Sequence, residues 1–154
     1  MNGKKSLIVS LVISLGVGGL SALLTRNSME IYKILRQPPL SPPGWVFPVV
    51  WTILFVLMGI AAWMVWREGA PERKDALRLY GLQLVFNFFW TIIFFNARRF
   101  GLALIWIVVL WCLILATIWE FRQVRPGAQK LLIPYLLWVS FAVYLNAGVW
   151  WLNR

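Results

Sequence analysis

Residues 100–119, FGLALIWIVVLWCLILATIW, contain no charged side chain. At about 1.5 Å of rise per residue, a helix of this length crosses the hydrocarbon core of a bilayer, which is roughly 30 Å thick. Backbone polar groups inside lipid must be hydrogen-bonded within their own segment, so we expect helices. The sequence therefore predicts an all-α membrane protein, a bundle of five transmembrane helices in the single domain 1–154. The five uncharged stretches are 7–24, 46–66, 79–97, 100–119 and 131–153.

The composition agrees with this prediction, because 61% of the 154 residues are hydrophobic and 13% are charged. Soluble domains have roughly 45–50% apolar and about 25% charged residues, so the composition argues against a soluble enzyme. The net charge of +10 comes from basic residues that flank the apolar stretches. In that position they indicate membrane orientation and contacts with anionic membrane lipids, and we expect no nucleic-acid partner.

The positive charges also predict an orientation. Five spans place the N-terminus and the second and fourth connections on one side of the membrane. That side carries nine Lys and Arg residues, against six on the other side. The excess favours a cytoplasmic N-terminus.

The residue types restrict the chemistry further. Histidine is absent, and the single cysteine, Cys112, lies within an apolar stretch. These counts exclude disulfides, zinc sites and catalytic triads, and we expect no bound metal and no required cofactor. No apolar stretch contains Asp, Glu, Lys or Arg. This absence argues against ion-coupled transporters and proton pumps.

The longest connection comprises residues 25–45. Asn27 resembles an N-cap residue, and Glu30 follows three positions later, which predicts a short helix up to Arg36. This helix must end before Pro38-Pro39, since a proline disfavours helical geometry in the preceding residue. A long connection that is part helix and part extended chain is a candidate lid.

Four small residues in the first stretch recur at a spacing of four. Such a stripe allows another helix to approach closely in lipid, so we interpret it as a packing face within the protomer. The residues are Ser10, Ser14, Gly18 and Ala22.

Eleven tryptophans are several times the usual number for such a chain. Those near the ends of the spans fit an interfacial belt, whereas Trp51, Trp90 and Trp138 lie deeper. The amides Gln83, Asn87 and Asn146 must face the bundle interior, because a buried amide needs partners. Either these groups only pack and bond the helices together, or they bind a flat conjugated ligand such as a tetrapyrrole or a polycyclic lipid.

Three motifs occur in order along the chain: Pro42-Pro43-Gly44-Trp45, then Gln83-Leu84 with Asn87 and Trp90-Thr91, then Pro134-Tyr135 with Trp138 and Leu145-Asn146. At these motifs the chain resembles the translocator protein family, also called tryptophan-rich sensory proteins or peripheral-type benzodiazepine receptors. The resemblance implies a five-helix bundle that forms a homodimer, with a cavity under the first loop. It also implies an integral multi-pass protein, which we expect in a bacterial cell membrane.

The family binds porphyrins, haem-related tetrapyrroles and sterols, and some bacterial members promote light-dependent porphyrin degradation. Our first hypothesis, from the resemblance, is a membrane receptor or sensor that binds protoporphyrin or a haem-related tetrapyrrole and contributes to its transport or disposal. The alternatives are a light-dependent porphyrin-degrading enzyme, with Trp51 and Trp138 as catalytic residues, and a structural partner protein. Carried over by motif, the ligand-binding residues are Tyr32, Trp51, Asn87, Trp90, Trp138 and Ala142.

Overall fold

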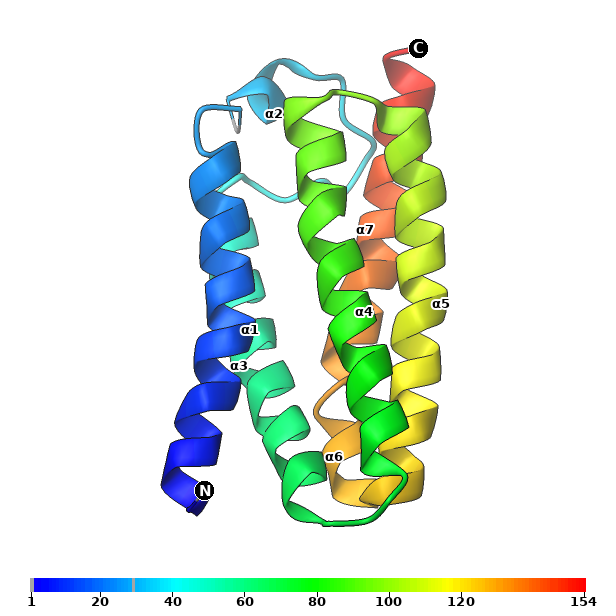
Figure 1. Ribbon diagram of the computed structural model, residues 1–154. Helices are drawn as coiled ribbons and strands as arrows, with labels where there is room; N and C mark the ends of the chain where they lie inside the picture. The colour runs from blue at the N-terminus through cyan, green and yellow to red at the C-terminus, as the bar shows by residue number, and fades with distance from the viewer. Residues whose placement is uncertain (1, 29) are drawn as a thin grey trace.

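The computed structural model describes residues 2–28 and 30–154. Long helices lie side by side, with the N-terminus at one end of the bundle and the C-terminus at the other (Figure 1). Within these residues, five helical segments are long and apolar enough to cross a membrane, which confirms the predicted five-helix membrane bundle. The elements are α1 (Gly3–Thr25), α2 (Ile31–Ile34), α3 (Val46–Arg67), α4 (Arg73–Thr91), η1 (Ile92–Asn96), α5 (Phe100–Val124), α6 (Pro126–Lys130) and α7 (Ile133–Leu152).

Several helices are longer than the uncharged stretches that predicted them. Helix α1 begins at Gly3, because the Asn2 side chain caps it by accepting a hydrogen bond from the Lys5 backbone N–H at 2.9 Å. Helix α4 begins at Arg73 and α5 continues to Val124, so both include charged turns. Charged side chains in the terminal turns can lie at the level of the lipid head groups, and the apolar pattern therefore marks only the part of each helix in hydrocarbon.

The last predicted stretch, 131–153, is by contrast longer than the helix it predicted, because α7 is Ile133–Leu152. The short helix α6 precedes it and is separated from α7 by a turn at Leu131 and Leu132. Pro134 stands in the first turn of α7, where its missing N–H removes no hydrogen bond of the helix. The break therefore sets the start of α7 at Ile133.

The small residues of α1 pack against α3. The Ser10 hydroxyl donates to the Gly59 carbonyl at 2.6 Å, and the Ser14 hydroxyl donates to the Phe55 carbonyl at 2.8 Å. A Cβ atom at Gly18 would lie 2.5 Å from the Phe55 ring, so only glycine allows this approach. These contacts confirm the predicted packing face within the protomer.

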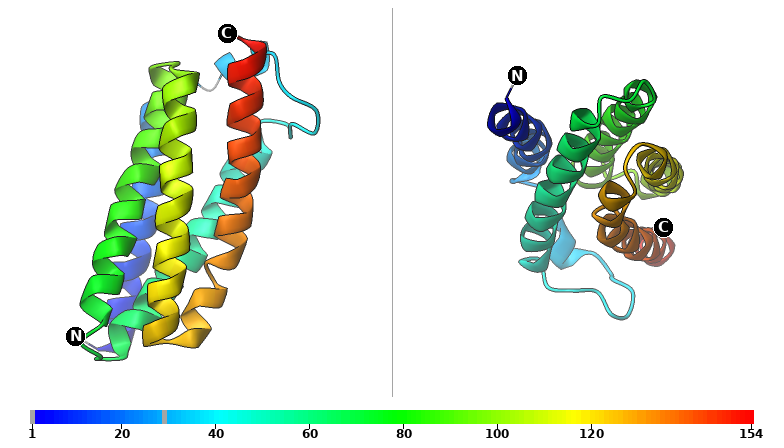
Figure 2. Two further views of the ribbon diagram at one scale, coloured as in Figure 1. Left: turned by 90° about the vertical axis from the view of Figure 1, so that its right-hand side faces the viewer. Right: turned by 90° about the horizontal axis from the view of Figure 1, so that it is seen from below.

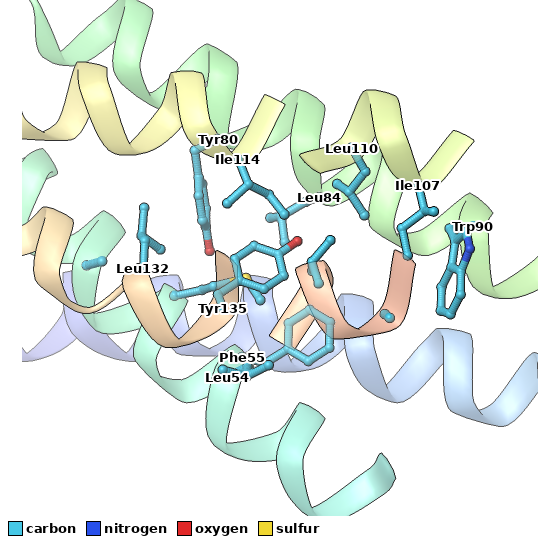
Figure 3. Packing of buried hydrophobic residues seen from close by; sticks show 14 of the residues in the cluster. Leu54, Phe55, Tyr80, Leu84, Trp90, Ile107, Leu110, Ile114, Leu132 and Tyr135 are labelled. Atoms are coloured by element: carbon cyan, nitrogen blue, oxygen red, sulfur yellow. The ribbon is translucent and has the colours of Figure 1, made fainter. Parts of the chain in front are cut away.

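Buried amides connect three helices. Asn87 of α4 donates to the hydroxyl of Tyr135 on α7 at 2.8 Å, and that hydroxyl donates to Gln83 Oε1 at 2.6 Å. One turn closer to the lid, the Trp90 indole donates to Asn146 Oδ1 at 2.9 Å. The Asn146 amide in turn donates to the backbone carbonyl at the start of α5. The positions of Tyr135 and Trp90 within the packed interior are shown in Figure 3.

The segment between α1 and α3 lies at the end of the bundle opposite the N-terminus, where it projects to one side and passes close to the end of α7 (Figure 2). Helix α2 ends at Ile34, two residues earlier than predicted, because the Gln37 side chain donates to the Tyr32 carbonyl and ends the turn. Asn153 then pairs with both backbone groups of Arg36, accepting from its N–H at 3.1 Å and donating to its carbonyl at 2.8 Å. We call residues 27–28 and 30–45 the lid.

Candidate ligand-binding site

A cavity of about 300 Å³ lies at the lid end of the bundle, between α1, α3, α4 with η1, and α7. This volume is at the lower end of the range for small-molecule sites, roughly 300–1,000 Å³. The lid contributes Tyr32 and Ser41 to its lining. The structure brings all six of the predicted ligand-binding residues to this one cavity: Tyr32, Trp51, Asn87, Trp90, Trp138 and Ala142.

Aromatic rings connect the lid to the cavity walls. The Tyr32 ring packs edge-on against Phe47 of α3 at 5.1 Å between centroids, and Phe47 packs against Trp138 of α7 at 5.9 Å. Trp51 lies one turn below Phe47 and contacts Phe55 at 5.6 Å. The indoles of α3 and α7 thus stand on two walls of the same cavity, as a flat ligand touching both would require.

The Tyr32 hydroxyl donates to the Pro42 carbonyl at 3.1 Å, so it ties the two halves of the lid together. Burial raises the pKa of Tyr32 above its usual value of 10.0, and the nearby Ser41 hydroxyl opposes this shift in part. The phenol is therefore neutral at physiological pH and keeps its proton for this hydrogen bond.

A π-helical turn forms the wall at the end of α4. In η1 the Ala97 N–H donates to the Ile92 carbonyl at 3.0 Å, a bond that spans five residues in place of four. Both Phe94 and Phe95 line the cavity, although they are adjacent in the chain. Phe94 also contacts Trp90, with 5.4 Å between ring centroids. The wider turn therefore gives this wall two neighbouring aromatic rings.

Most polar hydrogens in the lining already have partners within the protein. The Trp90 indole and the Asn146 amide are hydrogen-bonded between helices, as described above. Each lining hydroxyl of Ser or Thr donates to a backbone carbonyl near it in the chain. These hydroxyls belong to Ser21, Thr25, Ser41 and Thr91.

In the deep part of the cavity, two lining groups stay available for a ligand. The indole N–H of Trp138 is buried and has no hydrogen-bond partner among the described residues. Asn87 uses its amide nitrogen for Tyr135, while its oxygen accepts no hydrogen bond from the described residues. Because a buried donor without a partner costs about 1–3 kcal/mol, a ligand with an acceptor beside Trp138 would be stabilised. The deep cavity therefore offers one donor and one acceptor between aromatic surfaces.

Sequence reasoning missed the contribution of α1. Its small-residue stripe predicted helix packing only, yet Gly18 and Ala22 also line the cavity, as does Arg26. A signal was present, because Arg26 continues the same four-residue spacing at the lid end of α1. Conversely, Gln83 lies outside the cavity lining and supports Tyr135 from within the bundle.

Comparison with known proteins agrees with the resemblance that the motifs carry. The model of the TspO/MBR family matches residues 8–152. The chain belongs to the TspO/MBR family. A tryptophan-rich sensory protein of Cereibacter sphaeroides is 37% identical over 154 residues, which cover 99% of this chain and 95% of the relative. The translocator protein of Homo sapiens is 38% identical over 144 residues, or 92% of this chain and 85% of the relative.

A further bacterial relative, the tryptophan-rich protein TspO of Chlorobaculum tepidum, is 38% identical over 152 residues, which cover 96% of this chain and 94% of the relative. The chain is thus similar over nearly its whole length to sensory and translocator proteins. With five membrane-spanning helices in the structure, it is a multi-pass membrane protein of this family.

Proposed function

We propose that this protein is a membrane receptor or sensor that binds a tetrapyrrole, such as protoporphyrin, in the cavity under the lid, and contributes to its transport or disposal. The observation that carries the proposal is the lining of that cavity. Trp51 and Trp138 lie on different walls, and the free donor and acceptor are Trp138 Nε1 and Asn87 Oδ1. Aromatic surfaces bind a large conjugated ring, and two isolated polar atoms suit a ligand with few polar groups.

The experiment is a titration of the purified protein with protoporphyrin in the dark, in phosphatidylcholine nanodiscs. We expect saturable quenching of tryptophan fluorescence with one ligand per chain. Asn87→Leu should weaken binding about tenfold, because the ligand loses an acceptor in the cavity while the bundle stays folded. Leu115→Ala, on the exposed face of α5, is the control and should bind as the wild type does. Wild-type protein without saturable binding would instead support a structural partner protein.

A second candidate function is light-dependent degradation of the bound porphyrin. It is favoured by the indoles that line the cavity, Trp51 and Trp138 among them, because indoles are the most easily oxidised side chains there. The same nanodiscs are illuminated in air, and the loss of porphyrin per bound ligand is measured. Trp51→Phe and Trp138→Phe keep an aromatic surface, so dark binding should weaken only modestly while photoproduct yield falls much further. Equal yields in the wild type and both variants would reject the enzymatic role.

A further inference from the structure

We propose that Arg26 forms an anion subsite at the lid end of the cavity and binds a carboxylate on one edge of the ligand. The ligand class is then a planar, apolar molecule with an acidic edge, oriented with that edge toward the lid. This inference rests on the proposed function and makes it more specific, because it excludes a preference for neutral polycyclic ligands.

Arg26 occupies a position in the cavity wall that no other charged residue shares. It is the C-cap residue of α1 and follows Gly18 and Ala22 on the face that lines the cavity. Among the described lining residues it alone carries a charge. Since Thr25 is the last residue of α1, Arg26 lies where the cavity meets the lid.

The guanidinium of Arg26 is uncommitted in the described part of the chain, where it forms no ion pair and no side-chain hydrogen bond. The three ion pairs among the described residues use other side chains, and the nearby acid of the lid, Glu30, pairs with Lys33 at 3.3 Å. The neighbouring hydroxyls of Thr25 and Ser41 donate to backbone carbonyls. Arg26 therefore presents up to five N–H donors in a planar fork, the geometry that matches a carboxylate.

The charge around the lid end favours an anion at this position. Besides Arg26, the connections and the C-terminus at this end of the bundle carry five basic residues, and the lid contains one acid, Glu30. A basic rim raises the local concentration of anionic molecules and speeds their association. The basic residues are Lys33, Arg36, Arg98, Arg99 and Arg154.

The deep part of the cavity cannot accept the acidic edge. Its free polar groups are the neutral indole N–H of Trp138 and the amide oxygen of Asn87. An ionised carboxylate without a cationic partner is strongly disfavoured in such an apolar site, and the amide oxygen would repel it. The ring of the ligand therefore lies between the indoles, and its acid lies at Arg26.

A phosphate of a lipid head group carries the same anionic chemistry and can also approach Arg26 from the membrane surface. The experiment must therefore separate a ligand carboxylate from a lipid phosphate. Nanodiscs of phosphatidylcholine alone provide no anionic lipid, and nanodiscs with added phosphatidylglycerol provide one.

The test compares protoporphyrin, which has two carboxylates, with its dimethyl ester, which has none. In phosphatidylcholine nanodiscs the wild-type protein should bind the free acid about fivefold more tightly than the ester, the ratio expected for an exposed ion pair. Arg26→Gln should reduce this ratio to about one, and Arg26→Lys should restore part of it. Arg99→Gln removes an exposed charge at the same end outside the cavity lining, so it should keep the wild-type ratio.

Binding of the dimethyl ester to Arg26→Gln at wild-type affinity shows that the variant is folded. An unchanged preference for the free acid in Arg26→Gln overturns the subsite. The subsite is equally overturned if Arg26→Gln changes only the response to phosphatidylglycerol, because Arg26 then binds lipid. If the wild type binds neither porphyrin, the proposed function fails, and that result is distinct from the loss of the acid preference.

Discussion

The hydroxyl of Tyr135 is the centre of the buried hydrogen-bond network between α4 and α7. It accepts from Asn87 and donates to Gln83, and Tyr135 is 1% exposed. Tyr80 of α4 is also buried, but its hydroxyl has no hydrogen-bond partner among the described residues. Both rings point into the interior of the bundle (Figure 3). The substitutions Tyr135→Phe and Tyr80→Phe therefore delete the same atom from similar surroundings with different bonding.

The expected magnitudes follow from these partners. Tyr135→Phe removes two interhelical hydrogen bonds, which at about 0.6 kcal/mol each in a membrane protein amounts to about 1.2 kcal/mol. It also leaves the Asn87 donor and the Gln83 acceptor buried without that partner, which brings the expected loss to about 2 kcal/mol. Tyr80→Phe removes a buried hydroxyl that has no hydrogen-bond partner among the described residues, so we expect no loss of stability or a small gain.

The assay is the free energy of unfolding in mixed detergent micelles, measured by circular dichroism as the mole fraction of dodecyl sulfate increases. The difference between the two variants is the decisive quantity, because it cancels the common effect of removing a hydroxyl. Equal losses for Tyr135→Phe and Tyr80→Phe would refute the argument that the network between α4 and α7 stabilises the bundle.

Three further outcomes are expected. Gly59→Ala should lower the melting temperature, because its Cβ would lie 2.7 Å from a hydroxyl oxygen of α1, whereas Gly16→Ala meets open space and should be neutral in the same thermal scan. Burial raises the pKa of Tyr32, so lid closure should be independent of pH below 10 and should weaken as the pH rises through the raised pKa. The rate of porphyrin release, measured by stopped flow, should show this dependence in the wild type and lack it in Tyr32→Phe. Asn153→Ala removes both hydrogen bonds to the Arg36 backbone and should accelerate release about tenfold in the same assay; an unchanged rate would show that this pair does not restrain the lid.

The helices could be predicted from the sequence because a bilayer requires long uncharged segments. This requirement determined the number of helices and the middle of each one. It gave no information about the ends, where charged turns extend α4 and α5 into the head-group region. The η1 turn could not be predicted either, because the residues of Ile92–Asn96 are all compatible with an ordinary α-helix.

The position of the lid depends on contacts that are distant in the chain. Arg36 and Asn153 are 117 residues apart, and no local pattern connects them. Similarly, the exposed hydroxyl of Tyr144 on α7 donates to the Pro39 carbonyl at 2.6 Å. The proline-rich composition predicted a stiff segment between two spans. The direction in which that segment folds depends on these side-chain hydrogen bonds to its backbone.

The amides show why the sequence could not choose between a structural and a ligand-binding role. Asn146 lines the cavity, but its oxygen accepts from Trp90 and its nitrogen donates to the Phe100 carbonyl. Both polar atoms of this amide therefore hold helices together. Asn87 uses only its nitrogen, for Tyr135, and keeps its oxygen free. The two amides therefore differ in the number of polar atoms already bonded within the protein, and only Asn87 keeps an oxygen that a ligand could use. Spacing along a helix predicts which amides face the interior, but only the positions of the other helices determine which amide retains an acceptor for a ligand.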